Sequence, residues 1–174
     1  MNENTTLAAI LTQAMQLERE GHAFYLAAAE QTQAEAGRRM FLSLARDELQ
    51  HLQLLDGVYR SWLAKGAWPS SAELALAPRQ PLPVFPPVGL VAASVPPRTG
   101  ELEALRQGIA AEESSIALYR QGLETAALPQ AQEFYEYLVQ QEEGHRTILQ
   151  GEYDHLTHTG FWFDVREFDL ESMG

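Results

Sequence analysis

One arrangement of glutamate and histidine residues occurs twice in this sequence and limits the folds open to the chain. The arrangement is a glutamate, a second glutamate thirty residues later, and a histidine three residues after that. It comprises Glu18, Glu48 and His51, and it returns 94 residues further on as Glu112, Glu142 and His145. Because Glu-x-x-His places both side chains on one face of a helix, with Cβ atoms about 5–6 Å apart, the pattern predicts helices that bring these six groups together.

The residues around this pattern have the spacing of a helical bundle core. In the first segment the seam contains Leu11, Ala14, Glu18, Gly21 and Tyr25. Three further segments have seams of the same kind, and alternating steps of three and four residues are typical of helices that pack in a bundle. Each candidate ligand therefore lies in a seam, with hydrophobic residues one turn away on either side.

The same spacing places the turns between the helices. If Glu18 and Glu48 lie at one level on antiparallel helices, the turn between them falls near residue 33. The corresponding turn in the second half falls near residue 127, just before Pro129, and proline suits a first helical turn. The sequence thus predicts two antiparallel helical hairpins.

A proline-rich linker joins the two predicted hairpins. Residues 66–100 contain eight of the nine prolines, which excludes a long helix there, although Ser70 and Glu73 are suited to cap one short helical turn. This linker is long enough to run the length of the bundle, roughly 40 Å for 27 helical residues. We therefore predict an all-α, ferritin-like four-helix bundle whose hairpins are joined by a long lengthwise crossover.

We expect the 174 residues to form a single domain. Its predicted parts are a helical hairpin at 5–65, the crossover at 66–100, a second hairpin at 101–158 and an aromatic C-terminal tail at 159–174. The tail contains Phe161-Trp162-Phe163, which is too apolar for a free end. We expect it to pack on the bundle or on a second subunit.

Four carboxylates and two imidazoles in an apolar seam point to two metal ions. Mixed oxygen and nitrogen ligation suits iron or manganese and differs from the thiolate-rich sites of structural zinc. Without metal the carboxylates would repel each other, so their pKa values should be raised or they should share protons. Two divalent ions would balance the four negative charges, and the alternative is a buried polar network that binds no metal.

Other polar residues near the pattern suggest supporting roles. Tyr25 and Tyr119 lie two turns beyond a ligand glutamate and are placed to hydrogen-bond the ligands. Asp47 and Gln141 each precede a ligand glutamate and are candidates to orient the opposite histidine, whereas His22 is interpreted as structural or surface. We interpret Glu113 and Glu143 as solvated and assign no role to His155 and His158.

The composition limits which cellular compartment and which binding partners we expect. The chain has no cysteine, which excludes disulfides, thiolate catalysis and iron–sulfur ligation by its own residues. Its net charge of −12 disfavours binding to nucleic acid and to anionic membranes. No apolar run reaches the roughly 18 residues of a transmembrane helix and no signal peptide is evident, so we expect a cytoplasmic protein.

The chain resembles the rubrerythrin branch of the ferritin-like superfamily over about 120 of its 174 residues. The residues that carry this resemblance in the first half are Glu18, Phe24-Tyr25, Ala28-Ala29-Glu30, Phe41, Leu44-Ala45, Glu48 and His51. Those in the second half are Glu112, Leu118-Tyr119, Phe134, Leu138, Glu142 and His145. Together these motifs are specific for the di-iron superfamily and less specific for one activity.

The resemblance implies a di-iron centre that reacts with peroxide or dioxygen. It implies that the six repeated glutamates and histidines are iron ligands and that Tyr25 and Tyr119 support them. Two departures matter: the chain lacks the four cysteines of a rubredoxin-like domain, and Ser115 stands where rubrerythrins have a further glutamate. An external electron-donor protein is therefore expected, and the ligand set is closer to the symmetric set of bacterioferritin.

From these features we expect a homodimeric di-iron oxidoreductase. Peroxide reduction is the first reading, with oxidation of Fe(II) by dioxygen (ferroxidase activity) close behind, and a manganese or mixed-metal pair remains open. The alternatives are an iron binding or storage protein without redox turnover, and a helical interaction module with a vestigial site.

Overall fold

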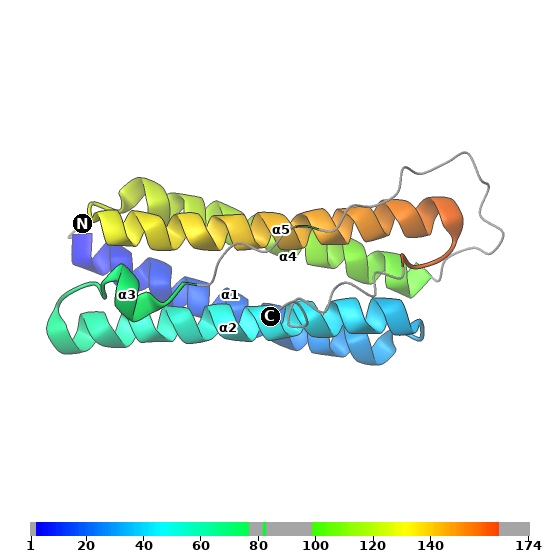
Figure 1. Cartoon of the computed structure of the whole chain (residues 1–174), viewed down its shortest axis with the longest axis horizontal. Coiled ribbons are helices and arrows are strands. Elements are labelled where there is room, and N and C mark those ends of the chain that lie inside the picture. The colour runs from blue at the N-terminus through cyan, green and yellow to red at the C-terminus, as the bar shows by residue number, and fades with distance from the viewer. Residues whose placement is uncertain (1–2, 77–81, 83–98, 164–174) are drawn as a thin grey trace.

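The structure, a computed structural model, describes residues 3–76, 82 and 99–163. These residues form α1 (Glu3–Gln31), α2 (Glu35–Lys65), the short α3 (Ser71–Leu74), α4 (Thr99–Thr125) and α5 (Pro129–Thr159), with no strand among them. The four long helices lie alongside one another as a bundle (Figure 1). The predicted all-α ferritin-like bundle is confirmed.

Each hairpin turns where the spacing predicted. Residues 32–34 separate α1 from α2, and residues 126–128 separate α4 from α5. In Figure 1, α2 ends at the left of the bundle and α4 begins at the right. The connection between them therefore joins opposite ends of the bundle, as a lengthwise crossover requires, although 77–81 and 83–98 lie outside the described residues.

A short helix marks the start of the crossover. The backbone N–H of Ser70 donates to Glu73 Oε2 over 2.8 Å, and the N–H of Glu73 donates to Ser70 Oγ over 3.3 Å. This reciprocal pair is the predicted capping box, and it begins α3. Next to it, the ring of Trp68 packs against Phe134 of α5 with centroids 5.7 Å apart, which fixes the start of the crossover on the bundle.

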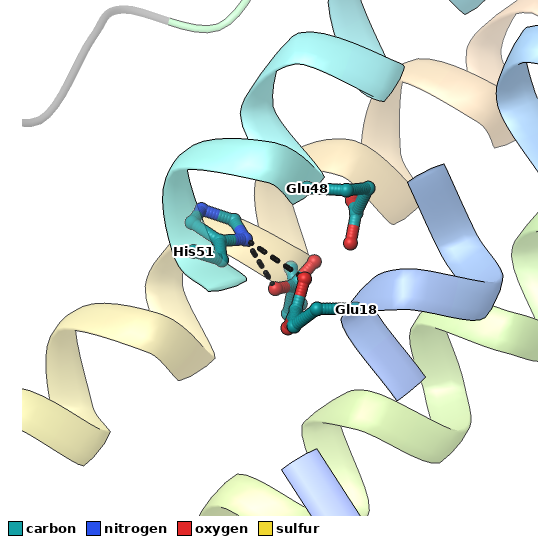
Figure 2. Close-up of side chains that lie close together, drawn as sticks. Glu18, Glu48 and His51 are labelled. Carbon is teal, nitrogen blue, oxygen red and sulfur yellow. Dashed lines mark ion pairs between the residues drawn. The ribbon is translucent and has the colours of Figure 1, made fainter. Parts of the chain in front are cut away.

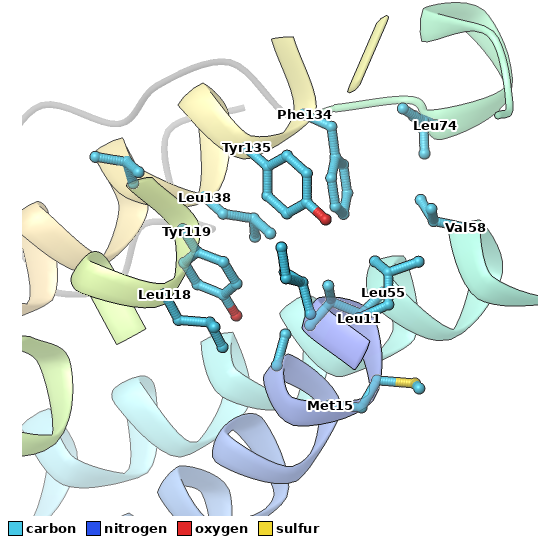
Figure 3. Close-up of a cluster of buried hydrophobic side chains, with 13 residues drawn as sticks. Leu11, Met15, Leu55, Val58, Leu74, Leu118, Tyr119, Phe134, Tyr135 and Leu138 are labelled. Carbon is cyan, nitrogen blue, oxygen red and sulfur yellow. The ribbon is translucent and has the colours of Figure 1, made fainter. Parts of the chain in front are cut away.

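Two hydrophobic clusters make up the core, one toward each end of the bundle. Figure 3 shows the first cluster, which contains Leu11, Leu55, Tyr119, Phe134 and Leu138 among others. The second contains Tyr25, Phe41, Leu44, Leu105 and Leu149 among others. The predicted ligands lie at sequence positions between these clusters on all four long helices, so a polar layer divides an otherwise apolar core.

Among the described helices, none combines the length and apolar character needed to cross a bilayer. The division of the whole chain as a single domain remains a prediction, as does the homodimer.

Candidate metal centre

The polar layer is built from side chains of all four long helices. Glu18 comes from α1, Glu48 and His51 from α2, Glu112 from α4, and Glu142 and His145 from α5. None of the six is more than 4% exposed. The hydrophobic residues one turn away on each seam bury these groups, because a helix that buries its seam must bury the polar residues on it as well.

The six residues form two overlapping groups, each able to surround one ion. Glu18, Glu48, His51 and Glu142 form one group, and Glu48, Glu112, Glu142 and His145 form the other. Within each group, ligand-type atoms from the four residues all lie within 4.8 Å of one another. Glu48 and Glu142 belong to both groups, and carboxylates shared in this way are placed to bridge a metal pair.

The imidazole of His51 points its Nδ1 atom into this layer. Nδ1 lies 2.9 Å from Glu142 Oε1 and 3.5 Å from Glu18 Oε2. Figure 2 shows His51 directed toward Glu18, with Glu48 on the preceding turn of the same helix. The ring is therefore oriented as a ligand of the Glu18 group.

The imidazole of His145 is arranged in the same way in the other group. Its Nδ1 lies 3.1 Å from Glu48 Oε1, 3.0 Å from Glu142 Oε2 and 3.8 Å from Glu112 Oε2. The His51 and His145 rings stack with centroids 5.5 Å apart and planes inclined by 24°. The two histidines thus line the side of the cluster formed by α2 and α5.

Two tyrosines support the glutamates across the helix pair α1 and α4. The Tyr25 hydroxyl of α1 donates to Glu112 Oε1 on α4, and the Tyr119 hydroxyl of α4 donates to Glu18 Oε1 on α1. Burial, with the nearby carboxylate charges, raises the pKa of both phenols well above their usual value. Both therefore remain protonated donors at neutral pH, and the exchange of partners is what a two-fold axis between the halves produces.

The two candidates for orienting the histidines differ in outcome. Asp47 Oδ2 lies 3.4 Å from His145 Nε2, on the side of the ring away from the cluster. A carboxylate there fixes the ring so that Nδ1 faces the centre. No comparable contact joins Gln141 to His51 among the described residues, so the pairing exists in one half only.

Residues interpreted as lying outside the site do so. His22 Nδ1 lies 2.6 Å from the carbonyl oxygen of Ala45, which ties α1 to α2 and gives this histidine a structural role. Glu113 is exposed, and Glu143 pairs with Arg120 over 2.6 Å on the surface. These residues are close in sequence to the ligands but face away from them.

Burial and mutual charge set the protonation of the cluster in the absence of metal. Burial raises the pKa of Glu48 well above its usual value, and burial with the charge of Glu142 raises the pKa of Glu112 to about 8. Burial alone would also raise the pKa of Glu142, but contact with His51 and His145 lowers it well below 4.5. The expectation of raised carboxylate pKa values is therefore correct for Glu48 and Glu112 and wrong for Glu142, which both histidines face.

The histidines respond in the opposite direction. Burial lowers the pKa of His51 and of His145, yet the surrounding carboxylates outweigh it and raise both values well above 6.5. For His51 the main partner is Glu142, and for His145 the contacts include Asp47. Without metal, protons on both imidazoles and on the carboxyl groups of Glu48 and Glu112 thus reduce the negative charge of the cluster.

The donor set fits a pair of metal ions. Four buried atoms of the cluster have no hydrogen-bond partner among the described residues: Glu18 Oε2, Glu48 Oε1, His51 Nδ1 and Glu142 Oε1. Some are close to one another, but the contacts lack the alignment of hydrogen bonds. Buried carboxylate oxygens without partners are costly, and two divalent cations would satisfy both the orphaned atoms and the charge.

The structure also shows features that the sequence analysis did not assign. Gly21 lies against the cluster: a Cβ atom there would be 3.2 Å from Glu48 Oε2. A pocket of about 330 Å³ opens beside it between α1 and α4. The only signal in the sequence was a glycine in a seam of larger residues, one turn from Glu18.

The fold and the cluster together define a class: ferritin-like bundles whose core carboxylates and histidines are able to hold two metal ions. Within the chain, residues 9–74 match the family model for rubrerythrin. The match spans most of α1 together with α2 and α3, and it includes Glu18, Glu48 and His51. The resemblance to rubrerythrin-like members of the ferritin-like superfamily is thus confirmed over residues 9–74. Comparisons with curated proteins and with solved structures gave no match.

Proposed function

We propose that this protein is a di-iron oxidoreductase of the rubrerythrin type that reduces peroxide, with dioxygen as the second candidate oxidant. The observation that carries the proposal is the pair of overlapping ligand groups that share Glu48 and Glu142. A single site would leave one buried carboxylate and one imidazole without a cation. Two sites use all six groups.

Iron is proposed because of the ligand chemistry. Carboxylate oxygen and imidazole nitrogen are ligands that suit iron, and the same set also accepts manganese. The rubrerythrin match over residues 9–74 favours iron. Metal analysis of the purified protein therefore decides between an iron pair and a manganese or mixed pair.

The residues divide the work by position. Glu48 and Glu142 would hold both ions, while Glu18 with His51 and Glu112 with His145 complete one position each. A pair of ferrous ions bound there supplies two electrons, enough to reduce one hydrogen peroxide to two waters when two protons are added. An external electron donor would then restore the ferrous state.

The surrounding side chains would keep the ligands in place during this change of charge. Tyr25 and Tyr119 hold one oxygen of Glu112 and of Glu18, which leaves the other oxygen of each glutamate free for a metal. The hydrophobic clusters on either side of the layer limit the access of water. Such an arrangement favours reaction with a small oxidant.

A dioxygen reaction is favoured by one observation. Ser115 occupies the position at which rubrerythrins have a further glutamate, and it is 7% exposed at the wall of the pocket. The cluster therefore has the symmetric set of four glutamates and two histidines. This set is closer to that of bacterioferritin, for which oxidation of Fe(II) by dioxygen is the implied reaction.

The test is an anaerobic titration of metal-free protein with Fe(II), followed by addition of peroxide or air. We expect two irons per chain, oxidised faster by peroxide than by air. Glu112→Gln should lose one iron, whereas Glu113→Gln, the exposed neighbour, should bind as the wild type does.

Each other outcome selects an alternative. Faster oxidation by air favours a ferroxidase. Binding of two irons without redox cycling by any added donor favours iron binding or storage. Failure to bind iron or manganese contradicts the proposal and leaves a helical module with a vestigial site.

A further inference from the structure

A pocket connects the solvent with one part of the candidate metal centre. It lies between α1 and α4 and has a volume of about 330 Å³. At its outer side are the exposed residues Glu20, Gln107 and Ser114, and at its inner side are the buried carboxylates of Glu48 and Glu112. Glu48 brings to this wall a buried side chain whose Oε1 has no hydrogen-bond partner.

Small residues keep this passage open. Gly21 has no side chain, and a Cβ atom there would approach Glu48 Oε2 to 3.2 Å. Across the pocket, α4 contributes Ala111 and Ser115. Larger side chains at these positions would fill the space between the exposed rim and the cluster.

The opposite side of the cluster is covered. There the rings of His51 and His145 stack between α2 and α5, with centroids 5.5 Å apart. Leu82 of the crossover lies against α5, because a Cβ atom on Gly144 would be 3.2 Å from its Cδ2 atom. The pocket between α1 and α4, by contrast, leads from the solvent to the candidate ligands.

The pocket does not treat the two halves of the cluster equally. Glu112 and Tyr25 line it, whereas Glu18 and Tyr119, their equivalents 94 residues away, do not. One difference between the halves lies at the residue before each ligand glutamate. That residue is Leu17 on α1 and Ala111 on α4, and both line this pocket.

We propose that this pocket is the entrance for divalent metal ions and that it serves the position formed by Glu112 and His145 before the position formed by Glu18 and His51. The inference rests on the proposed metal centre. An ion at the rim meets the carboxylate of Glu20, which an amide of Gln16 holds over 2.7 Å. It then meets the buried carboxylate of Glu48, whose Oε2 lies beside Gly21, and the net charge of −12 favours cations along the whole path.

The entrance is tested by the rate at which metal-free protein binds Co(II), followed by stopped-flow absorbance. We expect two Co(II) per chain in two phases. His145→Ala should remove the faster phase, and His51→Ala should remove the slower one. Ala111→Leu, which places in the pocket the side chain of the other half, should slow the faster phase about tenfold and leave the final stoichiometry at two.

Leu17→Ala is the matched variant: Leu17 lines the same pocket from α1, so its truncation widens the entrance and should accelerate the faster phase. Gly21→Ala is a second way to narrow the entrance, and it favours helix formation. It should slow the faster phase. If circular dichroism shows that Ala111→Leu does not fold, Gly21→Ala tests the entrance in its place.

The results separate this inference from the proposed function. If wild type binds two Co(II) in a single phase, or if a folded narrowing variant binds at the wild-type rate, the entrance proposal is wrong while the metal centre stands. If no Co(II) binds, the metal centre itself is wrong.

Discussion

At the scale of single residues, the exchange of hydrogen-bond partners between Tyr25 and Tyr119 organises the candidate centre. Each phenol crosses from one hairpin to the other and fixes one oxygen of a buried glutamate. A glutamate held at one oxygen has fewer rotamers to lose when its other oxygen binds a metal. These hydroxyls therefore act on metal affinity through the position of Glu112 and Glu18.

Removal of either hydroxyl should weaken metal binding. We expect Tyr25→Phe and Tyr119→Phe each to lower affinity for Fe(II) or Mn(II) by about tenfold, the lower limit for loss of a group that supports a ligand. Competition with a chelator of known affinity measures this. The double variant should bind more weakly than either single variant.

Tyr135→Phe provides the matched control. Tyr135 is also buried, but its hydroxyl has no hydrogen-bond partner. Loss of that hydroxyl should leave metal affinity unchanged and should not lower stability, because an unsatisfied buried polar group is removed. Equal loss of affinity in all three variants would show that the effect comes from core packing alone.

Individual residues also show where prediction from the sequence succeeds and where it fails. The clustering of the six glutamates and histidines follows from helical periodicity, which depends only on spacing. The pairing of Asp47 with His145, without an equivalent for Gln141, depends on side-chain length and on the exact separation of α2 and α5. The lowered pKa of Glu142 likewise depends on both histidines facing one carboxylate, which no spacing reveals.

At the scale of elements, the C-terminal segment after α5 is docked on α2. Trp162 stacks edge-on against Phe41 with centroids 5.8 Å apart, and its Nε1 donates to Glu101 Oε2 over 3.3 Å. The indole lies so close to Gly37 that a Cβ atom there would be 2.5 Å from Cε2. The described part of the tail thus packs on the bundle, one of the two expected arrangements, while 164–174 lie outside the described residues.

Gly37→Ala should therefore displace the indole and weaken this docking. We expect the free energy of unfolding to fall by about 1–3 kcal/mol, the usual range for overpacking a well-packed contact. The change should be accompanied by greater solvent exposure of Trp162 in fluorescence quenching. Chemical denaturation gives the free energy of unfolding.

A second glycine on the same helix separates packing from helix propensity. A Cβ atom on Gly57 would have nothing within 4 Å. Gly57→Ala should stabilise the protein by about 0.5–1 kcal/mol, because alanine favours the helix and nothing opposes it. Stabilisation by both substitutions would contradict the docking of Trp162 over Gly37.

The elements themselves could be predicted in large part. Seams of three and four residues, the proline-rich stretch and Pro129 place the four helices and both turns, because these are local properties of the chain. The close approach of Trp162 to Gly37 joins residues that are far apart in sequence, so local patterns do not predict it. The sequence of an aromatic tail is also the same whether the tail packs on its own bundle or on a second subunit.

At the scale of the whole molecule, the polar layer makes folding and metal binding interdependent. All four long helices contribute to it, and unfolding separates all six glutamate and histidine side chains. We expect each bound metal to add about 2.7 kcal/mol to the free energy of unfolding at a free concentration one hundred times its Kd. Thermal unfolding with and without a chelator measures this gain, and equal melting temperatures would contradict a metal centre.

The stability of metal-free protein should fall as pH rises from about 5 to 8.5. Glu112 has a pKa of about 8 when folded against 4.5 in its usual state, so its contribution is present below 4.5 and is lost as pH rises through 8. The raised pKa values of His51 and His145 act in the same direction, with contributions that are complete below 6.5. The lowered pKa of Glu142 affects stability only in acid, below 4.5.

The stabilisation that bound metal provides should show the opposite trend in this range. Metal binding displaces the protons on Glu112 and the histidines, so affinity rises with pH as those protons leave. The difference in melting temperature between loaded and metal-free protein should therefore widen from pH 6 to about pH 8.5. In metal-free Glu112→Gln, whose amide does not titrate, the pH dependence should be shallower than in wild type. If this difference in melting temperature narrowed with rising pH, protons on the buried groups would not be competing with the metal.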